Sequence, residues 1–116
     1  MQFETRTRKI QEGTVLSITG RMDAVTAPEI EKGLSALVDS GEKRLIIDLK
    51  DLEYISSAGL RSILVLAKRL KREEGNMVFA NLQGHVMEVF RVSGFYALFT
   101  ICDSVDDALG RLGKIS

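Results

Sequence analysis

Two adjacent serines, Ser56 and Ser57, stand between a short apolar run and the most regularly patterned helix of the sequence. The preceding run, residues 44–49, is almost continuously apolar, which is typical of a strand covered on both faces. After the serines, apolar residues recur every three or four positions and predict an amphipathic helix to about Glu74. Hydroxyls at a helix start lie beside free backbone N–H groups and the positive end of the helix dipole, which favour negative charge. Ser57 is therefore the main candidate functional residue.

A serine in front of an apolar helix also has an ordinary structural role, because its side chain often caps the first turn. Two features favour function instead. The junction lies beyond the C-terminal end of a buried strand, where open α/β sheets place their sites. In addition, Gly59 carries no side chain, so we expect the first helical turn to be open to the close approach of another protein. The residues alone leave both interpretations open.

The length and the charge balance of the chain limit its number of domains and its kinds of partner. The 116 residues are expected to form one domain, residues 1–116, with a single core. Sixteen basic residues balance sixteen acidic ones, so no net field attracts nucleic acid or an anionic membrane. The single cysteine cannot form an internal disulfide, and neither a membrane span nor a signal peptide is visible. We expect a cytoplasmic domain without direct nucleic-acid or membrane contacts.

Strands and helices alternate along most of the chain. The patterns predict an N-terminal hairpin from residues 2–9 and 14–19, ended by Gly20, and later strands at 44–49, 77–80 and 98–101. Helices are predicted from Thr26 to about Gly41, from the serine pair to Glu74, from about Val86 to Gly94, and after Ser104. This order predicts an α/β fold with a mixed, mostly parallel sheet, right-handed crossovers and about four helices.

Two of these helices have recognisable starts. Thr26 and Glu29 have the spacing of a capping box, with Pro28 in the first turn. Ser104 is expected to cap the final helix, whose first turn holds Asp106 and Asp107.

The serine junction and an earlier loop resemble one known family. The segments that carry the resemblance are Asp48-Leu49, Tyr54-Ile55-Ser56-Ser57-Ala58-Gly59-Leu60, and upstream Gly20-Arg21-Met22-Asp23 with Thr26-Ala27. At this spacing they are similar to the signature of STAS domains, specifically the bacterial anti-sigma factor antagonists, over nearly the whole chain. The resemblance implies a single STAS domain acting as an anti-sigma factor antagonist that is expected to be monomeric when free.

In that family an ATP-dependent anti-sigma factor kinase phosphorylates a serine at the start of the second helix, and a PPM-type phosphatase removes the phosphate. The unmodified form binds the kinase and so frees its sigma factor. Alignment on Gly59-Leu60 implies Ser57 as the phosphoacceptor. Ser56, the less favoured candidate, stands where the family often has aspartate. The resemblance also implies that Asp23 lies near Ser57, although a loop aspartate that holds a turn is an equal interpretation.

A partner-binding surface is a further prediction. Val65 falls among basic residues on the polar side of the predicted helix. An isolated exposed apolar residue needs no explanation, and basic residues usually form a solvated face. The alternative is a surface beside the phosphoacceptor that binds the kinase, made of Asp23, Ser56, Gly59, Arg61, Val65 and Arg69.

The sequence does not contain the residue patterns of a metal site, a reactive cysteine, a phosphate-binding loop or a catalytic triad. His85 has no second histidine for a metal site, Cys102 has no basic partner in view, and neither a glycine-rich phosphate loop nor a catalytic triad order is present. We therefore expect no metal, no cofactor and no enzymatic activity. A response-regulator receiver domain would need an acidic pair after the first strand and a lysine after the last, which 9–11 and 101–102 do not supply. A STAS module with a non-sigma output, or one that binds a small ligand or nucleotide, remains the alternative.

Overall fold

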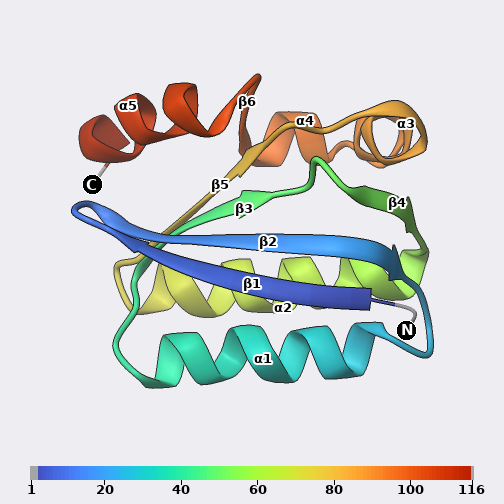
Figure 1. The fold of residues 1–116 in the computed structure, drawn as a ribbon, viewed down its shortest axis with the longest axis horizontal. Coiled ribbons are helices and arrows are strands. Elements are labelled where there is room, and N and C mark those ends of the chain that lie inside the picture. The colour runs from blue at the N-terminus through green and yellow to red at the C-terminus, as the bar shows by residue number, and fades with distance from the viewer. Residues whose placement is uncertain (1–2, 116) are drawn as a thin grey trace.

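The computed structural model describes the backbone of residues 3–115 and the side chains of residues 3–112. This part of the chain contains six strands and five helices (Figure 1). In chain order they are β1 (Phe3–Ile10), β2 (Gly13–Met22), α1 (Ala27–Asp39), β3 (Arg44–Asp48), β4 (Leu52–Ile55), α2 (Ser57–Arg72), β5 (Asn76–Ala80), α3 (Gly84–Val92), α4 (Phe95–Leu98), β6 (Thr100–Cys102) and α5 (Val105–Ile115).

The strands form one sheet in the order β1-β2-β3-β5-β6, and β4 pairs with β2. β1 and β2 are antiparallel, and the other pairs are parallel. The predicted α/β fold, with a mostly parallel sheet and an N-terminal hairpin, is thereby confirmed. The first strand was predicted to begin at Gln2, which lies outside the described residues.

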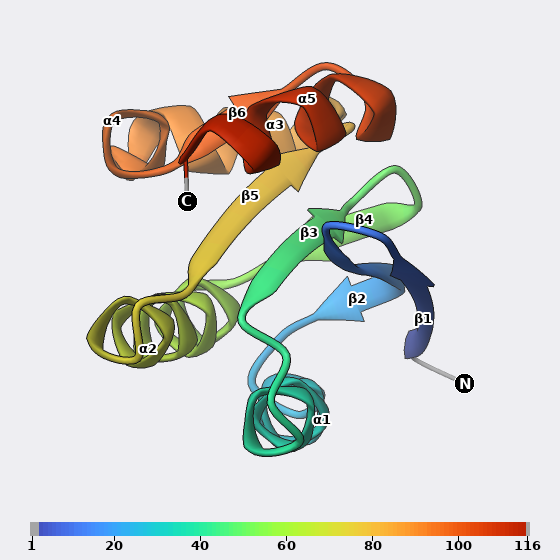
Figure 2. The same ribbon diagram turned by 90° about the vertical axis from the view of Figure 1, so that its left-hand side faces the viewer.

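Helices cover both faces of the sheet. α1 and α2 lie side by side on one face, and α5 lies on the other (Figure 2). Alternate strand side chains point to the two layers. Leu16 and Phe79 belong to the larger core, which includes residues of α1, α2 and α3. Ile46 and Val78 belong to the smaller core, which includes residues of α5. Both α1 and α2 follow parallel strands, so their N-termini lie at the same end of the molecule (Figure 1).

The predicted end of the second strand at Gly20 is wrong. Gly20 adopts φ 98°, a left-handed conformation that glycine tolerates, and the pairing register shifts between Gly20 and Arg21. β2 therefore continues to Met22, and from Gly20 onward it pairs with β4 rather than β3. Residues 52–55, which were not predicted as a strand, form β4. Consequently the serines follow β4, not β3.

The C-terminal third contains one more helix than predicted. Gly94 takes φ 85° and reverses the chain into the single turn of α4, so the last strand begins at Thr100 rather than Leu98. Phe95 of this turn is buried and meets Phe90 and Phe99 edge to face. The final helix starts as predicted, because the Asp107 N–H donates to Ser104 Oγ at 3.1 Å.

None of the described helices combines the length and apolar character needed to cross a membrane.

Candidate functional site

Ser56 is the N-cap of α2. Its backbone N–H donates to the Met22 carbonyl at 2.9 Å, which fixes the junction to the end of β2. Its side-chain oxygen accepts from the Gly59 N–H at 3.3 Å, and the residue is half-buried. This arrangement matches the structural role that serine commonly has before a helix. The Ser56 hydroxyl is therefore engaged by its own chain.

Ser57 differs from its neighbour in every one of these respects. It is the first residue of α2 and is exposed. Among the residues whose side chains are described, none forms a hydrogen bond with its hydroxyl. The free backbone N–H groups and the dipole of a 16-residue helix favour an anion at this end. The structure thus leaves Ser57 as the accessible hydroxyl of the pair.

Gly59 faces the interior, so the expectation that it opens the first turn to a partner is wrong. The residue is buried, and a Cβ added there would lie 2.8 Å from both the Met22 carbonyl oxygen and Ile55 Cγ1. Such distances are far shorter than ordinary van der Waals contact. The glycine allows α2 to pack directly onto the ends of β2 and β4, and it thereby positions the serines.

A hollow of about 450 Å³ lies between the starts of α1 and α2. Ser57 belongs to its lining. The other lining residues come from the loop before α1, the first turn of α1, and the first two turns of α2: Ala24, Ala27, Pro28, Ala58, Arg61 and Ser62. The two helices start side by side and leave a recess beside the candidate hydroxyl. No local sequence pattern predicts this recess.

Asp23 holds the loop in front of α1. Its Oδ1 accepts from the backbone N–H groups of Val25 and Thr26, each at 3.0 Å. The Thr26 N–H, helped by the Val25 N–H and by Arg21, lowers the pKa of the Asp23 carboxyl below its ordinary value. This geometry matches the interpretation of Asp23 as a turn residue. Within residues 3–112, no hydrogen bond joins the Asp23 and Ser57 side chains.

The predicted capping box at Thr26 is wrong. The Thr26 hydroxyl makes no cap hydrogen bond to α1. It donates instead to the Arg21 carbonyl at 2.7 Å and accepts from the Asp23 N–H at 2.9 Å. Thr26 is buried, so its hydroxyl closes the loop behind it. Asp23 Oδ1, three residues earlier, accepts from the backbone N–H of Thr26 itself and so belongs to the same loop.

Of the three α2 residues predicted to form a partner-binding surface, two are exposed and the third, Arg69, is ion-paired. Arg61 is exposed and Val65 is 47% exposed. Arg69 instead joins α2 to α1, since its guanidinium pairs with Asp39 and donates to Glu73 at 3.0 Å. Arg69 is thus occupied by ion pairs within the chain, and its predicted part in partner binding stays a prediction.

Arg69→Gln is expected to reduce stability modestly. The Arg69 guanidinium lowers the pKa of Glu73 from its ordinary 4.5, so the pair stabilises the fold above that pH. Its contribution is lost as pH falls through the lowered value. We expect a lower urea midpoint than wild type at pH 7 and low salt, with the difference shrinking in 1 M salt and at low pH. Lys68→Gln, on the same helix, is the control. A difference independent of salt and pH would contradict the ion-pair explanation.

A stack of three side chains at this end of the sheet was not predicted. The Arg21 guanidinium carbon lies 4.2 Å from the centre of the Tyr54 ring, and the His85 ring stacks on Tyr54 at 4.9 Å. His85 Nε2 also lies 3.4 Å from the Ile55 carbonyl oxygen. The stack links β2, β4 and α3, and its central residue, Tyr54, lies two positions before Ser56. No sequence signal joins these residues, because they meet only after β4 pairs with β2.

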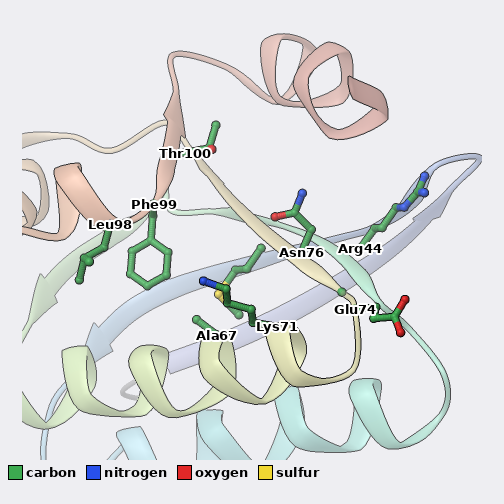
Figure 3. Close-up of a pocket in the computed structure, with 10 residues that line it drawn as sticks. Arg44, Ala67, Lys71, Glu74, Asn76, Leu98, Phe99 and Thr100 are labelled. Carbon is green, nitrogen blue, oxygen red and sulfur yellow. The ribbon is translucent and has the colours of Figure 1, made fainter. Parts of the chain in front are cut away.

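A second cleft, of about 380 Å³, lies at the other end of α2 (Figure 3). Arg44 and Glu74 line one side of it, and the apolar side chains of Leu98 and Phe99 line the other (Figure 3). At 1.5 Å per residue, the helix separates this cleft from Ser57 by roughly 20 Å. It holds neither a nucleophile with a neighbouring base nor, like the rest of the described chain, a cluster of metal-ligating residues.

Comparison with known proteins agrees with this fold. Residues 4–108 match the model of the STAS domain family. BtrV of Bordetella bronchiseptica, a candidate anti-sigma factor antagonist, is 41% identical over 100 residues, which cover 86% of each chain. The crystal structure of an anti-sigma factor antagonist from Mycobacterium paratuberculosis has a TM-score of 0.86 and 26% identity, covering 95% of this chain and 93% of that one.

A phosphorylated relative has the same fold. The Bacillus cell fate determinant SpoIIAA in its phosphorylated form has a TM-score of 0.73 at 18% identity, covering 94% of this chain and 99% of that one. The resemblance drawn from the serine junction and the Asp23 loop is thereby confirmed at the level of family and fold.

Proposed function

Because the chain belongs to the STAS domain family, we propose that it is an anti-sigma factor antagonist whose partner is selected by phosphorylation of Ser57. Its partners are an anti-sigma factor serine kinase, which binds the unmodified form, and a PPM-type phosphatase. The protein acts as a binding module in the cytoplasm, without enzymatic activity or cofactor. BtrV, which is 41% identical, is named as a candidate anti-sigma factor antagonist, and this name supports the proposed role.

The contrast between the two serines carries the choice of Ser57. Ser56 uses its side-chain oxygen as the cap of α2, whereas Ser57 is exposed at the first helical position. A phosphate on Ser56 would remove a cap, which typically contributes about 1 kcal/mol. A phosphate on Ser57 adds charge where the helix dipole tolerates it. The same fold exists in a phosphorylated form in SpoIIAA.

The modification is a phosphoryl transfer. Ser57 Oγ forms a bond to the γ-phosphorus of ATP while the bond from that phosphorus to the bridging oxygen of ADP breaks. The hydroxyl proton passes to a base of the kinase, and ADP leaves. In the reverse half of the cycle, water attacks the phosphorus, so that the serine hydroxyl is restored and inorganic phosphate is released.

The switch follows from the added charge. Phosphoserine carries about −1.5 to −2 charges at neutral pH. A kinase packed over Ser57 would have to remove this charge from water, which costs several kcal/mol. We place the kinase on the exposed surface formed by Val25, Ser57, Arg61 and Val65, with Asp23 and Ser56 shaping it from beneath. Val25 and Val65, 72% and 47% exposed, are the apolar points of this surface. Binding is then lost without a change of fold.

Mapping the phosphate tests the proposal. The full chain is incubated with its purified anti-sigma factor kinase and ATP, and tandem mass spectrometry locates the modified residue. We expect one phosphate, on Ser57, and none when ATP is added without the kinase. Phosphate on another residue, or self-modification with ATP alone, would refute the assignment.

A further inference from the structure

Arg61 lies one helical turn after Ser57, and both line the hollow between α1 and α2. Side chains at this i, i+4 spacing are neighbours on a helix surface, with about 5–6 Å between their Cβ atoms. Arg61 is the only charged residue among the seven that line the hollow. Within the part of the chain whose side chains are described, it forms no ion pair, in contrast to Arg69 two turns later. Its guanidinium is thus available to an anion at Ser57.

Ser62 supplies a second polar group from the same recess. The residue is only 5% exposed, and it lines the hollow. No hydrogen bond to its hydroxyl is found among residues 3–112. Buried hydroxyls are usually paired, often with a carbonyl one turn earlier in a helix. Ser62 is thus a nearly buried residue whose hydroxyl makes no hydrogen bond within residues 3–112, and it lines the same hollow as the Arg61 guanidinium, so one ligand in the hollow can reach both groups.

The walls of the hollow leave the space open. Its other residues, Ala24, Ala27, Pro28 and Ala58, are all small or rigid. Arg21, at the end of β2, and Asp23, in the loop before α1, lie 3.5 Å apart and pair with each other. No carboxylate lines the hollow, so no group in its lining competes for Arg61 or repels an anion.

We propose that this hollow receives the phosphate carried by Ser57, with the Arg61 guanidinium and the Ser62 hydroxyl as its ligands within the same chain. The inference rests on the proposed function, since it takes Ser57 as the acceptor. Guanidinium and phosphate form charge-assisted hydrogen bonds, which are stronger than neutral ones. The phosphorylated form therefore holds its phosphate against α2 instead of presenting it freely to solvent. Arg61 then helps to determine how long the phosphate persists before the phosphatase removes it.

The test installs phosphoserine at position 57 during translation, so no kinase is needed. A pH titration followed by ³¹P NMR gives the second pKa of the phosphate. A nearby cation favours the dianion, so Arg61→Gln is expected to raise this pKa by roughly half a unit relative to the wild-type chain. Ser62→Ala should raise it by a smaller amount. Lys68→Gln removes an exposed charge three turns from Ser57 on the same side of α2, and should leave the pKa unchanged.

Two results would overturn the phosphate site. One is an equal pKa in the Arg61→Gln and wild-type chains. The other is an equal rise in Arg61→Gln and Lys68→Gln, which would show a general charge effect instead of a specific contact. Proton NMR spectra of the variants verify folding. Since the phosphate is installed without a kinase, this experiment can succeed even if the kinase modifies another residue. In that case only the proposed function fails.

Discussion

Replacing Gly59 by alanine is expected to lower the free energy of unfolding by about 1–3 kcal/mol, the range found when extra methyl groups are forced into a packed core. The new methyl would lie 2.8 Å from the Met22 carbonyl oxygen, a backbone atom that cannot rotate away. It would also lie 2.8 Å from Ile55 Cγ1. Relief requires α2 to move from the ends of β2 and β4. Urea unfolding measures the loss.

Gly33 provides a matched control for this substitution. It also lies within a helix, α1, but nothing lies within 4 Å of a Cβ added there. Gly33→Ala is therefore expected to stabilise the protein by about 0.5–1 kcal/mol, the usual gain over glycine inside a helix. The two alanines should thus act in opposite directions. A stabilising Gly59→Ala would show that the junction has more space than the structure gives it.

The Gly59 contact explains how the fold presents Ser57. The Met22 carbonyl accepts from the Ser56 N–H and touches the space beside Gly59. The end of β2 therefore fixes both the start of α2 and its distance from the sheet. Ser57, the next residue, is carried on this fixed turn yet remains exposed. A rigid base beneath an accessible hydroxyl suits a residue that another enzyme must reach.

The sequence predicts α2 well because the helix has a strong local pattern. Its apolar stripe and the serine pair place the start of the helix at the residues where the structure has it. The strand β5, the N-terminal hairpin and the Ser104 cap of α5 are local in the same sense. The sequence signal for each lies within a few residues, where periodicity and capping preferences can detect it.

β4 and the extension of β2 could not be predicted in the same way. β4 has only four residues, and its strand character depends on pairing with residues 20–22 of β2, across the register shift after Gly20. Gly20 alone is an ordinary strand terminator, and only the later pairing turns it into a bulge. The single turn of α4 is comparable, since its place depends on the cluster of phenylalanine rings around Phe95.

The candidate site, like the fold, could be predicted from the sequence only where its signals are local. The position of Ser57 follows from the strand-to-helix junction, but the roles of its neighbours depend on tertiary contacts. Thr26 does not cap α1 with its side chain, and Asp23 accepts from the Thr26 N–H within the loop before the helix. Arg69 is paired with Asp39 of α1, which lies 30 positions away. A serine at position 62, within the apolar stripe of α2, was the one available signal for the hollow.

Ser57→Asp is expected to weaken binding to the anti-sigma factor kinase by roughly tenfold or more, which corresponds to at least about 1.4 kcal/mol of binding free energy. The carboxylate places a permanent charge where the kinase surface must close over Ser57. Folding should be unaffected or slightly strengthened, because an acidic residue in the first helical turn interacts favourably with the dipole. Ser57→Ala should bind the kinase as tightly as the unmodified chain, and ATP should no longer release it. Isothermal titration calorimetry with and without ATP measures both effects.

Gln83→Asp separates a local effect from a general one. Gln83 is the exposed N-cap of α3 and makes no cap hydrogen bond, so this variant adds the same charge at the start of a different helix. It should keep wild-type affinity for the kinase. If Ser57→Asp and Gln83→Asp weaken binding equally, long-range repulsion explains the loss and the surface around Ser57 need not touch the kinase. If Ser57→Asp binds as wild type does, a negative charge at this position is compatible with the complex, and the switch must lie elsewhere in the chain.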